Sequence, residues 1–293
     1  MVRTLCPNCK VASRWQLTAK LTILSAMARR CLSILLVMVC AIAHLPAQTQ
    51  GPYRLDVARE GVLAAGGATF LAAGLALGGS IEPLSIDAIN SLSRSDVPAI
   101  DRGATYNYSV SLKSTSNWLE ALLILAPVGL FASPDVRNDA GTVTVMYLET
   151  VLLANALTQF TKSLTTRTRP FVYNESAPLD EKQEKDARRS FFSGHAANSF
   201  ASAVFLSTVF AAYFPQSPWK PVVWAASLAA AATVAYLRVA AGQHFPTDVL
   251  TGMIVGSTVG YLVPELHRSD GTAVGIAPAP LQRGYRLALS IQF

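Results

Sequence analysis

Long apolar runs recur along this chain and are separated by shorter polar stretches. Each run is about 17–20 residues long, which is the length that a helix needs to cross the hydrocarbon core of a bilayer. The pattern predicts an all-α, membrane-embedded bundle of about five or six helices. The runs span residues 62–79, 117–133, 142–161, 195–214, 219–237 and 247–264.

Tryptophan and small residues fit this interpretation. Trp118, Trp219 and Trp224 lie near the ends of runs, where interfacial aromatic side chains gather. Glycine and alanine are abundant in 62–79 and 225–235, which permits close contact between helices in lipid. A soluble, alanine-rich helical bundle is the alternative. It is disfavoured because only 14% of the residues are charged, which leaves little polar surface to cover the apolar runs.

The connections and the tail predict smaller elements. The longer connections span 80–116 and 171–194, and the mixed charges of the second predict a solvated short helix or loop. Residues 284–293 alternate apolar with small or polar side chains, which is the period of a β-strand. One strand cannot close a membrane barrel. We expect this strand instead to pair with Thr272–Ile276 as a small β-hairpin.

The charge of the chain is unevenly distributed. The formal net charge of +6 lies entirely in residues 1–47, which hold six basic side chains and no acid. The rest of the chain has 18 basic and 18 acidic side chains. It therefore lacks the basic surface that is typical of nucleic-acid binding, and no nucleic-acid partner is expected.

Residues 1–47 have the pattern of a targeting segment. Two arginines follow Met27, the apolar run Leu32–Ala43 comes next, and Ala47 is a small residue at the expected cleavage position. We expect a secretory signal that starts at Met27, after an upstream extension over 1–26, and is then cleaved. An uncleaved membrane anchor is the alternative. All four cysteines lie in this segment, so no disulfide is expected in the mature chain.

These features divide the chain into four parts. The extension and signal are followed by an N-terminal helix and loop, a helical core and a tail. The parts span 1–47, 48–116, 117–266 and 267–293.

Three short clusters at predicted helix ends carry the candidate chemistry. They supply three fixed cations, two imidazoles, one carboxylate and a Ser-Gly turn. A cation in apolar surroundings is costly unless an anion pairs with it, so these residues indicate a site for a phosphate-like oxyanion. If each helix crosses the membrane once, the clusters meet on one face of the bundle. They read Lys162-x6-Arg169-Pro170, Ser193-Gly194-His195 and Arg238-x5-His244-x3-Asp248.

Other ionisable residues are weaker candidates. Metal catalysis and a bound cofactor are not expected, because few histidines follow residue 47, one of them is His267 in the tail, and no tight cluster of histidines and carboxylates is evident. Glu149 lies inside an apolar run and is expected to form a hydrogen bond within the bundle, although an ionisable group there can be functional. Arg167 either assists phosphate binding or lies at the surface. Arg188 or Arg189 could contact an acidic head group.

The three clusters resemble the signature of the type 2 phosphatidic acid phosphatase superfamily, which includes lipid phosphate phosphatases, bacterial acid phosphatases and vanadium haloperoxidases. That signature reads K-x6-RP, PSGH and SR-x5-H-x3-D, and the resemblance covers roughly residues 117–265. Phe192 replaces the proline before Ser-Gly-His, and Leu237 replaces the serine before Arg238. Both departures concern loop shape more than chemistry.

The resemblance implies a role for each matching residue. His244 would attack phosphorus, Asp248 would orient its imidazole, and His195 would act as general acid and then as general base. The phosphate oxygens would be bound by Lys162, Arg169, Arg238, Ser193 and Gly194.

We therefore expect a metal-independent phosphatase that hydrolyses a lipid phosphate or lipid pyrophosphate through a phosphohistidine. The alternatives are a vanadium-dependent haloperoxidase and a non-catalytic protein that binds or transports phospholipid. The resemblance implies a bacterial cell membrane as location, a membrane lipid phosphate as substrate and a catalytic face toward the periplasm. If a signal is removed and all six runs cross, parity instead puts the catalytic loops in the cytoplasm. The two expectations agree if 62–79 does not cross. The sequence indicates no particular oligomeric state.

Overall fold

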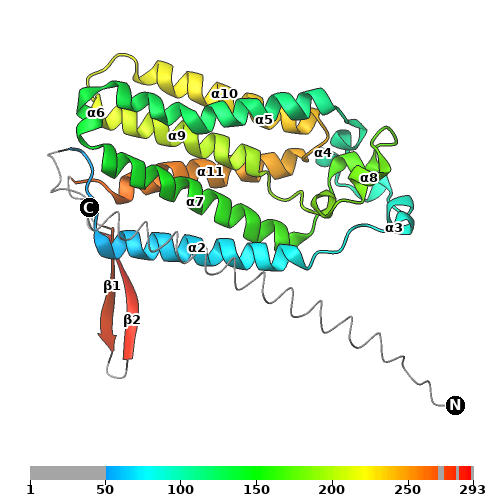
Figure 1. Ribbon diagram of the computed structural model, residues 1–293, viewed down its shortest axis with the longest axis horizontal. Coiled ribbons are helices and arrows are strands. Elements are labelled where there is room, and N and C mark those ends of the chain that lie inside the picture. Colours follow the sequence, from blue (N-terminus) through cyan, green and yellow to red (C-terminus); the bar gives the residue numbers. More distant parts are fainter. Residues whose placement is uncertain (1–50, 270–273, 282–283, 292–293) are drawn as a thin grey trace, which may run out of the picture. The chain divides into compact units, whose positions relative to one another are not determined.

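The computed structural model describes residues 51–269, 274–281 and 284–291. In this part of the chain six long helices lie side by side (Figure 1). They coincide with the six apolar runs, which confirms the predicted all-α bundle. The expectations for residues 1–47 lie outside the described residues. The long helices are α2 (Val57–Gly79), α5 (Val110–Leu125, continued by the 3-10 helix η3, Ala126–Ala132), α7 (Ala140–Thr165), α9 (Gly194–Tyr213), α10 (Lys220–Ala240) and α11 (Pro246–Leu266).

All six helices are long and apolar enough to cross a membrane, and α2 is among them. Large apolar side chains stay exposed along their surfaces, including Leu122, Ile254 and Trp118, which is 73% exposed. Water would penalise such side chains, whereas hydrocarbon surroundings do not. The protein is therefore an integral membrane protein.

Helix α9 occupies the centre of the bundle and contacts α5, α7, α10 and α11. Its buried positions are largely alanine and serine, whose small side chains let neighbouring backbones approach. On α11, Gly252, Gly256 and Gly260 face α9. A Cβ on any of them would lie 2.1–2.5 Å from a carbonyl oxygen of α9 or of its N-cap residue. The contact between α9 and α11 therefore requires glycine once per helical turn.

Helix α2 packs along α7 and runs in the same direction. Gly67 lies against Leu152, and Gly74 lies so close to the backbone of Phe160 that a Cβ would come within 2.5 Å of its nitrogen. Ser163 Oγ donates a hydrogen bond to the carbonyl oxygen of Gly74 at 2.7 Å. Because these contacts extend along both helices, α2 is a full member of the bundle.

The two ends of the bundle hold different elements. The site end collects the C-termini of α7 and α10, the N-termini of α9 and α11, and the short helices of the two long connections. The far end holds the start of α2 and the end of α11, where Arg54 N donates to His267 O at 2.8 Å. The far end also holds the short helix α6 (Pro134–Asn138). The short helices at the site end are α3 (Ile86–Asn90), η1 (Arg94–Asp96), α4 (Ala99–Arg102), η2 (Gly103–Tyr106), η4 (Pro170–Tyr173), α8 (Leu179–Lys182) and η5 (Lys185–Arg188).

The tail contains the predicted hairpin with a longer first strand. Strand β1 (Val274–Leu281) pairs antiparallel with β2 (Gly284–Ile291). The sequence placed the first strand at Thr272–Ile276 only. The rest of β1 was not predicted because it contains Pro278 and Pro280, and proline has no N–H group to donate to a partner strand. Proline is tolerated here because both strands of a two-stranded sheet are edge strands.

Candidate active site

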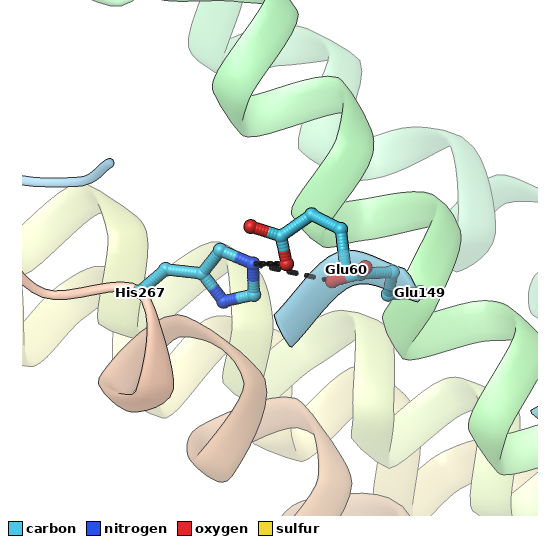
Figure 2. Close-up of side chains that lie close together, drawn as sticks. All are labelled: Glu60, Glu149 and His267. Carbon is cyan, nitrogen blue, oxygen red and sulfur yellow. Dashed lines mark hydrogen bonds and ion pairs between the residues drawn. The ribbon is translucent and has the colours of Figure 1, made fainter. Parts of the chain in front are cut away.

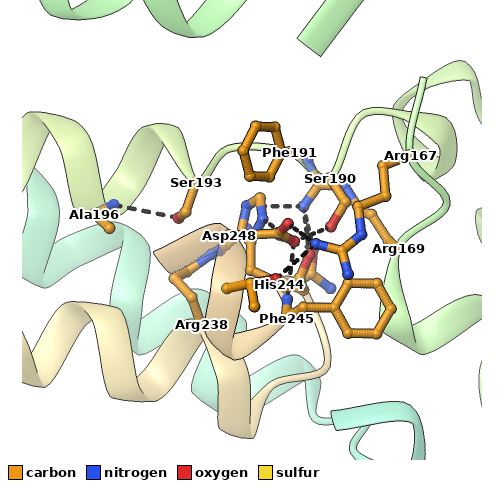
Figure 3. A network of polar contacts seen from close by, with 12 residues as sticks. Arg167, Arg169, Ser190, Phe191, Ser193, Ala196, Arg238, His244, Phe245 and Asp248 are labelled. Carbon is orange, nitrogen blue, oxygen red and sulfur yellow. Dashed lines mark hydrogen bonds and ion pairs between the residues drawn. The ribbon is translucent and has the colours of Figure 1, made fainter. Parts of the chain in front are cut away.

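The site end brings the three predicted clusters together, as Figure 3 shows. Arg169 Nη1 lies 3.4 Å from His244 Nε2. Oε1 of Gln243 accepts hydrogen bonds from Arg169 at 3.3 Å and from Arg238 at 3.4 Å. Residues from separate helix ends therefore surround one buried imidazole, as their positions in the sequence predicted.

A tight turn between α10 and α11 places His244. Gly242 in this turn has a φ of +71°, and a Cβ there would lie 2.0 Å from Asn107 O. Only glycine fits both the conformation and the space. The N–H groups of Gln243 and His244 donate to Arg238 O at 3.0 and 3.3 Å. Backbone contacts thus fix His244 relative to Arg238.

Asp248 lies in the first turn of α11 and faces His244, as the i, i+4 spacing predicted. Its Oδ2 is 3.5 Å from His244 Nδ1, which is longer than an ordinary hydrogen bond. The same oxygen accepts hydrogen bonds from Ser190 Oγ at 2.5 Å and from Phe245 N at 2.9 Å. Oδ1 accepts one from Arg167 Nη1 at 2.5 Å. The buried carboxylate is therefore held rigidly beside the imidazole.

The surroundings of His244 keep its imidazole neutral. Burial, and then the charges of Arg169, Lys162 and Arg238, lower the pKa of His244 well below its usual value of 6.5. A neutral imidazole carries the free lone pair that a nucleophile needs.

The three predicted cations are buried and largely lack anionic partners. Arg169 forms an ion pair with the exposed Asp186 at 2.7 Å. Among the described residues, no carboxylate lies within ion-pair distance of Lys162 or Arg238. Burying cations without counter-ions is costly, so this arrangement suits an anionic ligand. Guanidinium groups match phosphate oxygens in geometry as well as in charge.

His195 is oriented by α5, a helix that the sequence analysis did not connect with the site. Its Nε2 lies 3.0 Å from Glu120 Oε2 and 2.8 Å from Asn117 Oδ1. Asn117 Oδ1 also accepts a hydrogen bond from Arg238 Nη1 at 3.1 Å, and Asn198 Nδ2 donates to Glu120 Oε1 at 3.2 Å. Helix α5 thus links the histidine of the second cluster to the arginine of the third.

A signal for one of these residues was present in the sequence. Glu120 is a carboxylate inside an apolar run, which is the same signal that indicated Glu149. Asn117 gave no comparable signal, because an amide near a helix end is common. Gln243 and Ser190 likewise became candidates only through their contacts with Arg169 and Asp248.

Ser193 and Gly194 shape the start of α9. Ser193 Oγ accepts a hydrogen bond from Ala196 N at 3.3 Å and so caps the helix, and Ser193 N donates to Asp248 O at 3.0 Å. A Cβ on Gly194 would lie 3.1 Å from Thr158 Cγ2, so this glycine also serves the packing of α9 on α7. The hydroxyl hydrogen of Ser193 remains available as a donor while its oxygen caps the helix.

Arg167 is neither a surface residue nor placed among the buried cations. Its guanidinium bridges Asp248, at 2.5 Å, and Asp101, at 2.7 Å. It also lies over the ring of Phe245, with 4.2 Å from Cζ to the ring centroid. Asp101 accepts two further hydrogen bonds, from Thr247 N and Thr247 Oγ1. Arg167 therefore holds Asp248 through Oδ1, while Oδ2 is the oxygen nearer His244.

The two arginines considered for head-group contact have other partners. Arg188 Nη1 donates to Glu82 O at 3.0 Å, and Arg189 Nη2 donates to Gln159 Oε1 at 2.6 Å. These contacts tie the second long connection to the first connection and to α7.

The sequence gave no sign of a tight cluster of histidine and carboxylates, and this expectation was wrong. Glu60, Glu149 and His267 meet at the far end with their ligand atoms within 4.8 Å of one another. They come from α2, from α7 and from the residue after α11, so their separation in the sequence concealed the cluster. His267, which the sequence assigned to the tail, packs inside the bundle.

Comparison with known proteins gives matches in the region of the site. Residues 144–270 match the family model described as the PAP2 superfamily. Over 84 residues the chain is 32% identical to lipid A 4'-phosphatase of Porphyromonas gingivalis, which covers 28% of this chain and 32% of that protein. Over 154 residues it is 30% identical to a Schizosaccharomyces pombe protein named "Probable diacylglycerol pyrophosphate phosphatase 1", which covers 46% of this chain and 55% of that protein. The match thus spans about a third and about half of the lengths of these relatives.

One solved structure is also similar. It is a transmembrane PAP2 type phosphatidylglycerolphosphate phosphatase from Bacillus subtilis, with 22% identity, 68% of this chain and 94% of that chain covered, and a TM-score of 0.43. This superposition is too loose to support an argument. The family match instead covers all three clusters and the helices α7, α9, α10 and α11 that hold them. Over residues 144–270, this chain is therefore similar to the PAP2 superfamily.

Proposed function

We propose that this protein is a metal-independent phosphatase that hydrolyses a lipid phosphate or lipid pyrophosphate through a phosphohistidine on His244. The observation that carries the proposal is a buried, neutral imidazole 3.4 Å from Arg169 Nη1. Two more buried cations lie near it, Lys162 and Arg238, and neither has a carboxylate partner among the described residues. The family match and the phosphatase names of the two relatives support the same class of reaction.

The first step forms the phosphohistidine. The lone pair of His244 attacks phosphorus, and the bond between phosphorus and the leaving oxygen breaks. His195 donates a proton to that oxygen, while Asp248 stabilises the imidazole as it becomes positively charged. Negative charge on the non-bridging oxygens is stabilised by fixed cations, which takes the place of a metal ion. These cations are Lys162, Arg169 and Arg238.

The second step releases phosphate. His195, now neutral, takes a proton from a water molecule, whose oxygen attacks phosphorus and breaks the phosphorus–nitrogen bond. Inorganic phosphate leaves, and His244 returns to its neutral form. Glu120, 3.0 Å from His195 Nε2, stabilises the protonated histidine that the first step of each cycle requires.

A membrane lipid is the substrate class that this site favours. The site lies at the ends of membrane-spanning helices, and Asn117 within it is followed directly by the exposed, lipid-facing Trp118. A head group at the membrane surface can reach such a site while its acyl chains stay in the bilayer. The relatives are named for a lipid A phosphate and for a diacylglycerol pyrophosphate, both of which are lipids with a terminal phosphate.

The periplasmic face is part of the same proposal. With six crossing helices, the site end and residue 51 lie on opposite faces of the membrane. A periplasmic site therefore requires residue 51 to face the cytoplasm. A signal that carries residue 48 across the membrane would instead put the site in the cytoplasm. The packing of α2 along α7 supports a membrane-crossing α2, and so favours the first of these two arrangements only if residue 51 is cytoplasmic.

The decisive test is phosphate release by His244→Ala and His195→Ala variants, assayed with a panel of lipid phosphates in mixed micelles. Each substitution is expected to lower the rate at least about 100-fold, because each removes a group that takes part in bond making or proton transfer. The variants should elute and melt like the wild-type protein. Glu184→Gln, which changes an exposed carboxylate at the site end, is the control and should keep full activity.

A rapid-quench experiment with substrate labelled on its phosphate tests the intermediate directly. Wild-type protein should carry an acid-labile, base-stable label, as a phosphorus–nitrogen bond does, and His244→Ala should carry none. Full activity in either histidine variant would refute the mechanism. Halide oxidation with vanadate and peroxide, without phosphate release, would identify the haloperoxidase alternative.

A further inference from the structure

Three buried ionisable side chains meet at the far end of the bundle, where the proposed phosphatase reaction does not use them. Figure 2 shows Glu60, Glu149 and His267 pointing toward one another. His267 Nε2 lies 3.1 Å from Glu60 Oε2 and 3.2 Å from Glu149 Oε2. All three side chains are almost completely buried. Arg59 Nη2 pairs with Glu60 Oε1 at 3.0 Å, so one carboxylate charge remains to be neutralised by a bound proton or a bound cation.

The tautomer of His267 is fixed by its second nitrogen. Nδ1 lies 2.7 Å from the carbonyl oxygen of Val263, which can only accept, so Nδ1 carries a hydrogen. In a neutral imidazole the lone pair of Nε2 then points at two carboxylate oxygens. Three acceptors that face one another repel unless a positive centre lies between them. A histidine that donates Nδ1–H to a carbonyl and presents Nε2 is also the usual arrangement of a metal ligand.

The two carboxylates differ in their other contacts. Glu60 Oε1 accepts hydrogen bonds from Asp56 N at 2.6 Å and from Arg59 Nη2 at 3.0 Å, which fix its orientation. Glu149 accepts no hydrogen bond of good geometry from any residue that the structure describes. The guanidinium of Arg59 is therefore the one cation beside these two buried carboxylates among the described residues. Glu149 points into the cluster, and neither of its oxygens accepts a hydrogen bond of good geometry there.

The spacing fits a small divalent ion. Zinc binds histidine nitrogen and carboxylate oxygen at about 2.0–2.2 Å, so two ligands at a tetrahedral angle lie roughly 3.3–3.5 Å apart. The separations of 3.1 and 3.2 Å are close to this value. One imidazole and two carboxylates form a donor set that suits zinc and related transition metals better than magnesium or calcium.

We propose that Glu60, Glu149 and His267 bind a divalent transition-metal ion, with zinc as the best match. The site is structural and joins the first and third of the long helices, α2 and α7, to the end of the last, α11. A proton between His267 Nε2 and the two carboxylates is the competitor for the same position. The guanidinium of Arg59, which also faces the cluster, opposes both the proton and the metal.

The test is zinc binding by the purified full-length protein, prepared without a histidine tag and stripped with a chelator. The four cysteines in residues 1–47 are replaced by serine, because thiolates there could also bind zinc. This protein, with Glu60, Glu149 and His267 unchanged, is expected to bind one zinc ion per chain. Elemental analysis after dialysis and calorimetry measure the bound zinc. Zinc should also raise the melting temperature, because it binds only the folded chain.

Glu149→Gln and His267→Ala should each weaken zinc binding at least about tenfold and abolish the zinc-dependent rise in melting temperature. Glu149→Gln keeps the size of the side chain, so it is the variant that is expected to fold even if His267→Ala is not. Glu265→Gln, in the last turn of α11 but outside the cluster, is the matched control and should bind zinc like the wild type. Absence of stoichiometric zinc in the wild type, or equal binding by Glu149→Gln, would overturn the proposal and leave a proton-bridged ion pair.

Discussion

At the scale of single residues, the pairing of Glu120 with His195 has the clearest consequence for activity. Glu120→Gln keeps a polar group 3.0 Å from the imidazole but removes the charge that stabilises its protonated form. We expect kcat to fall roughly 10- to 100-fold, because proton transfer weakens. KM should change little, since no hydrogen bond or ion pair joins Glu120 directly to the three cations proposed to bind phosphate. Its hydrogen-bonded route to Arg238 passes through His195 and Asn117. Steady-state kinetics with a lipid phosphate measure both constants.

The control for this prediction is Glu184→Gln, which removes a carboxylate of the same kind from an exposed position at the site end. It should leave both kcat and KM unchanged. A rise in KM without a change in kcat for Glu120→Gln would show that Glu120 contributes to binding and not to proton transfer.

The protonation of His244 gives a second prediction at this scale. Because burial and three cations lower the pKa of His244, it should remain neutral as the pH falls through 6.5. Arg169→Gln removes the cation with the largest electrostatic effect on His244, so it should raise the pKa of His244 toward 6.5 and make the imidazole titrate at higher pH. Nitrogen-15 NMR of histidine-labelled protein measures this titration. A lower pKa in the variant would contradict the assignment.

Residue identity indicated the candidate reacting groups, which the structure brings together, better than it indicated their partners. Lys162, Arg169, Arg238 and the two histidines were found because charged residues are rare in an apolar chain and occur here at fixed spacing. The role of Glu120 depends on how α5 is rotated about its axis, and the role of Arg167 depends on the geometry of the connection after α7. Spacing along the chain specifies neither. The role of Glu120 can be derived only when α5 is seen beside α9.

At the scale of helices, the contact between α9 and α11 aligns the two histidines. A Cβ on Gly256 would lie 2.1 Å from Ala197 O, so Gly256→Ala must push the two helices apart. We expect a loss of roughly 1–3 kcal/mol in the free energy of unfolding. Phosphatase activity should also fall, because His195 is in the first turn of α9 and His244 directly precedes α11. Thermal unfolding in detergent and the lipid phosphate assay measure the two effects.

Gly66→Ala on α2 is the matched control, since nothing lies within 4 Å of the position that its Cβ would occupy. It should melt at or slightly above the wild-type temperature, because alanine is the better helix former. Equal behaviour of the two variants would mean that α9 and α11 can separate without cost.

The helices themselves were predictable because their length and apolarity are set by the membrane. The ends of the helices were less predictable. Helices α2 and α5 begin before the apolar runs, at Val57 and Val110, because a capping side-chain oxygen precedes each of them. The capping residues are Asp56 and Ser109. The parallel packing of α2 on α7 was not predictable, since it depends on small residues such as Gly74 that occur throughout this chain.

At the scale of the whole molecule, the site end and the far end of the bundle lie at opposite ends of the long helices. Labelling one residue at each end therefore tests which face of the membrane holds the site. In a background with the four native cysteines replaced by serine, Glu184→Cys marks the site end and Gln216→Cys marks the far end, and both residues are exposed. If the site faces the periplasm, a membrane-impermeant maleimide should label Glu184→Cys on intact cells. It should label Gln216→Cys only after the cells are permeabilised. The reverse pattern would place the site in the cytoplasm.

Under the proposed function, the position of Trp118 determines how the protein meets its lipid substrate. Trp118 is 73% exposed on a helix that is apolar enough to cross the membrane, and the preceding residue, Asn117, contacts both Arg238 and His195. Encounter with a lipid then takes place by diffusion in two dimensions. The rate should follow the mole fraction of substrate in the bilayer or micelle. Adding inert detergent at constant bulk substrate concentration should therefore slow the reaction by surface dilution.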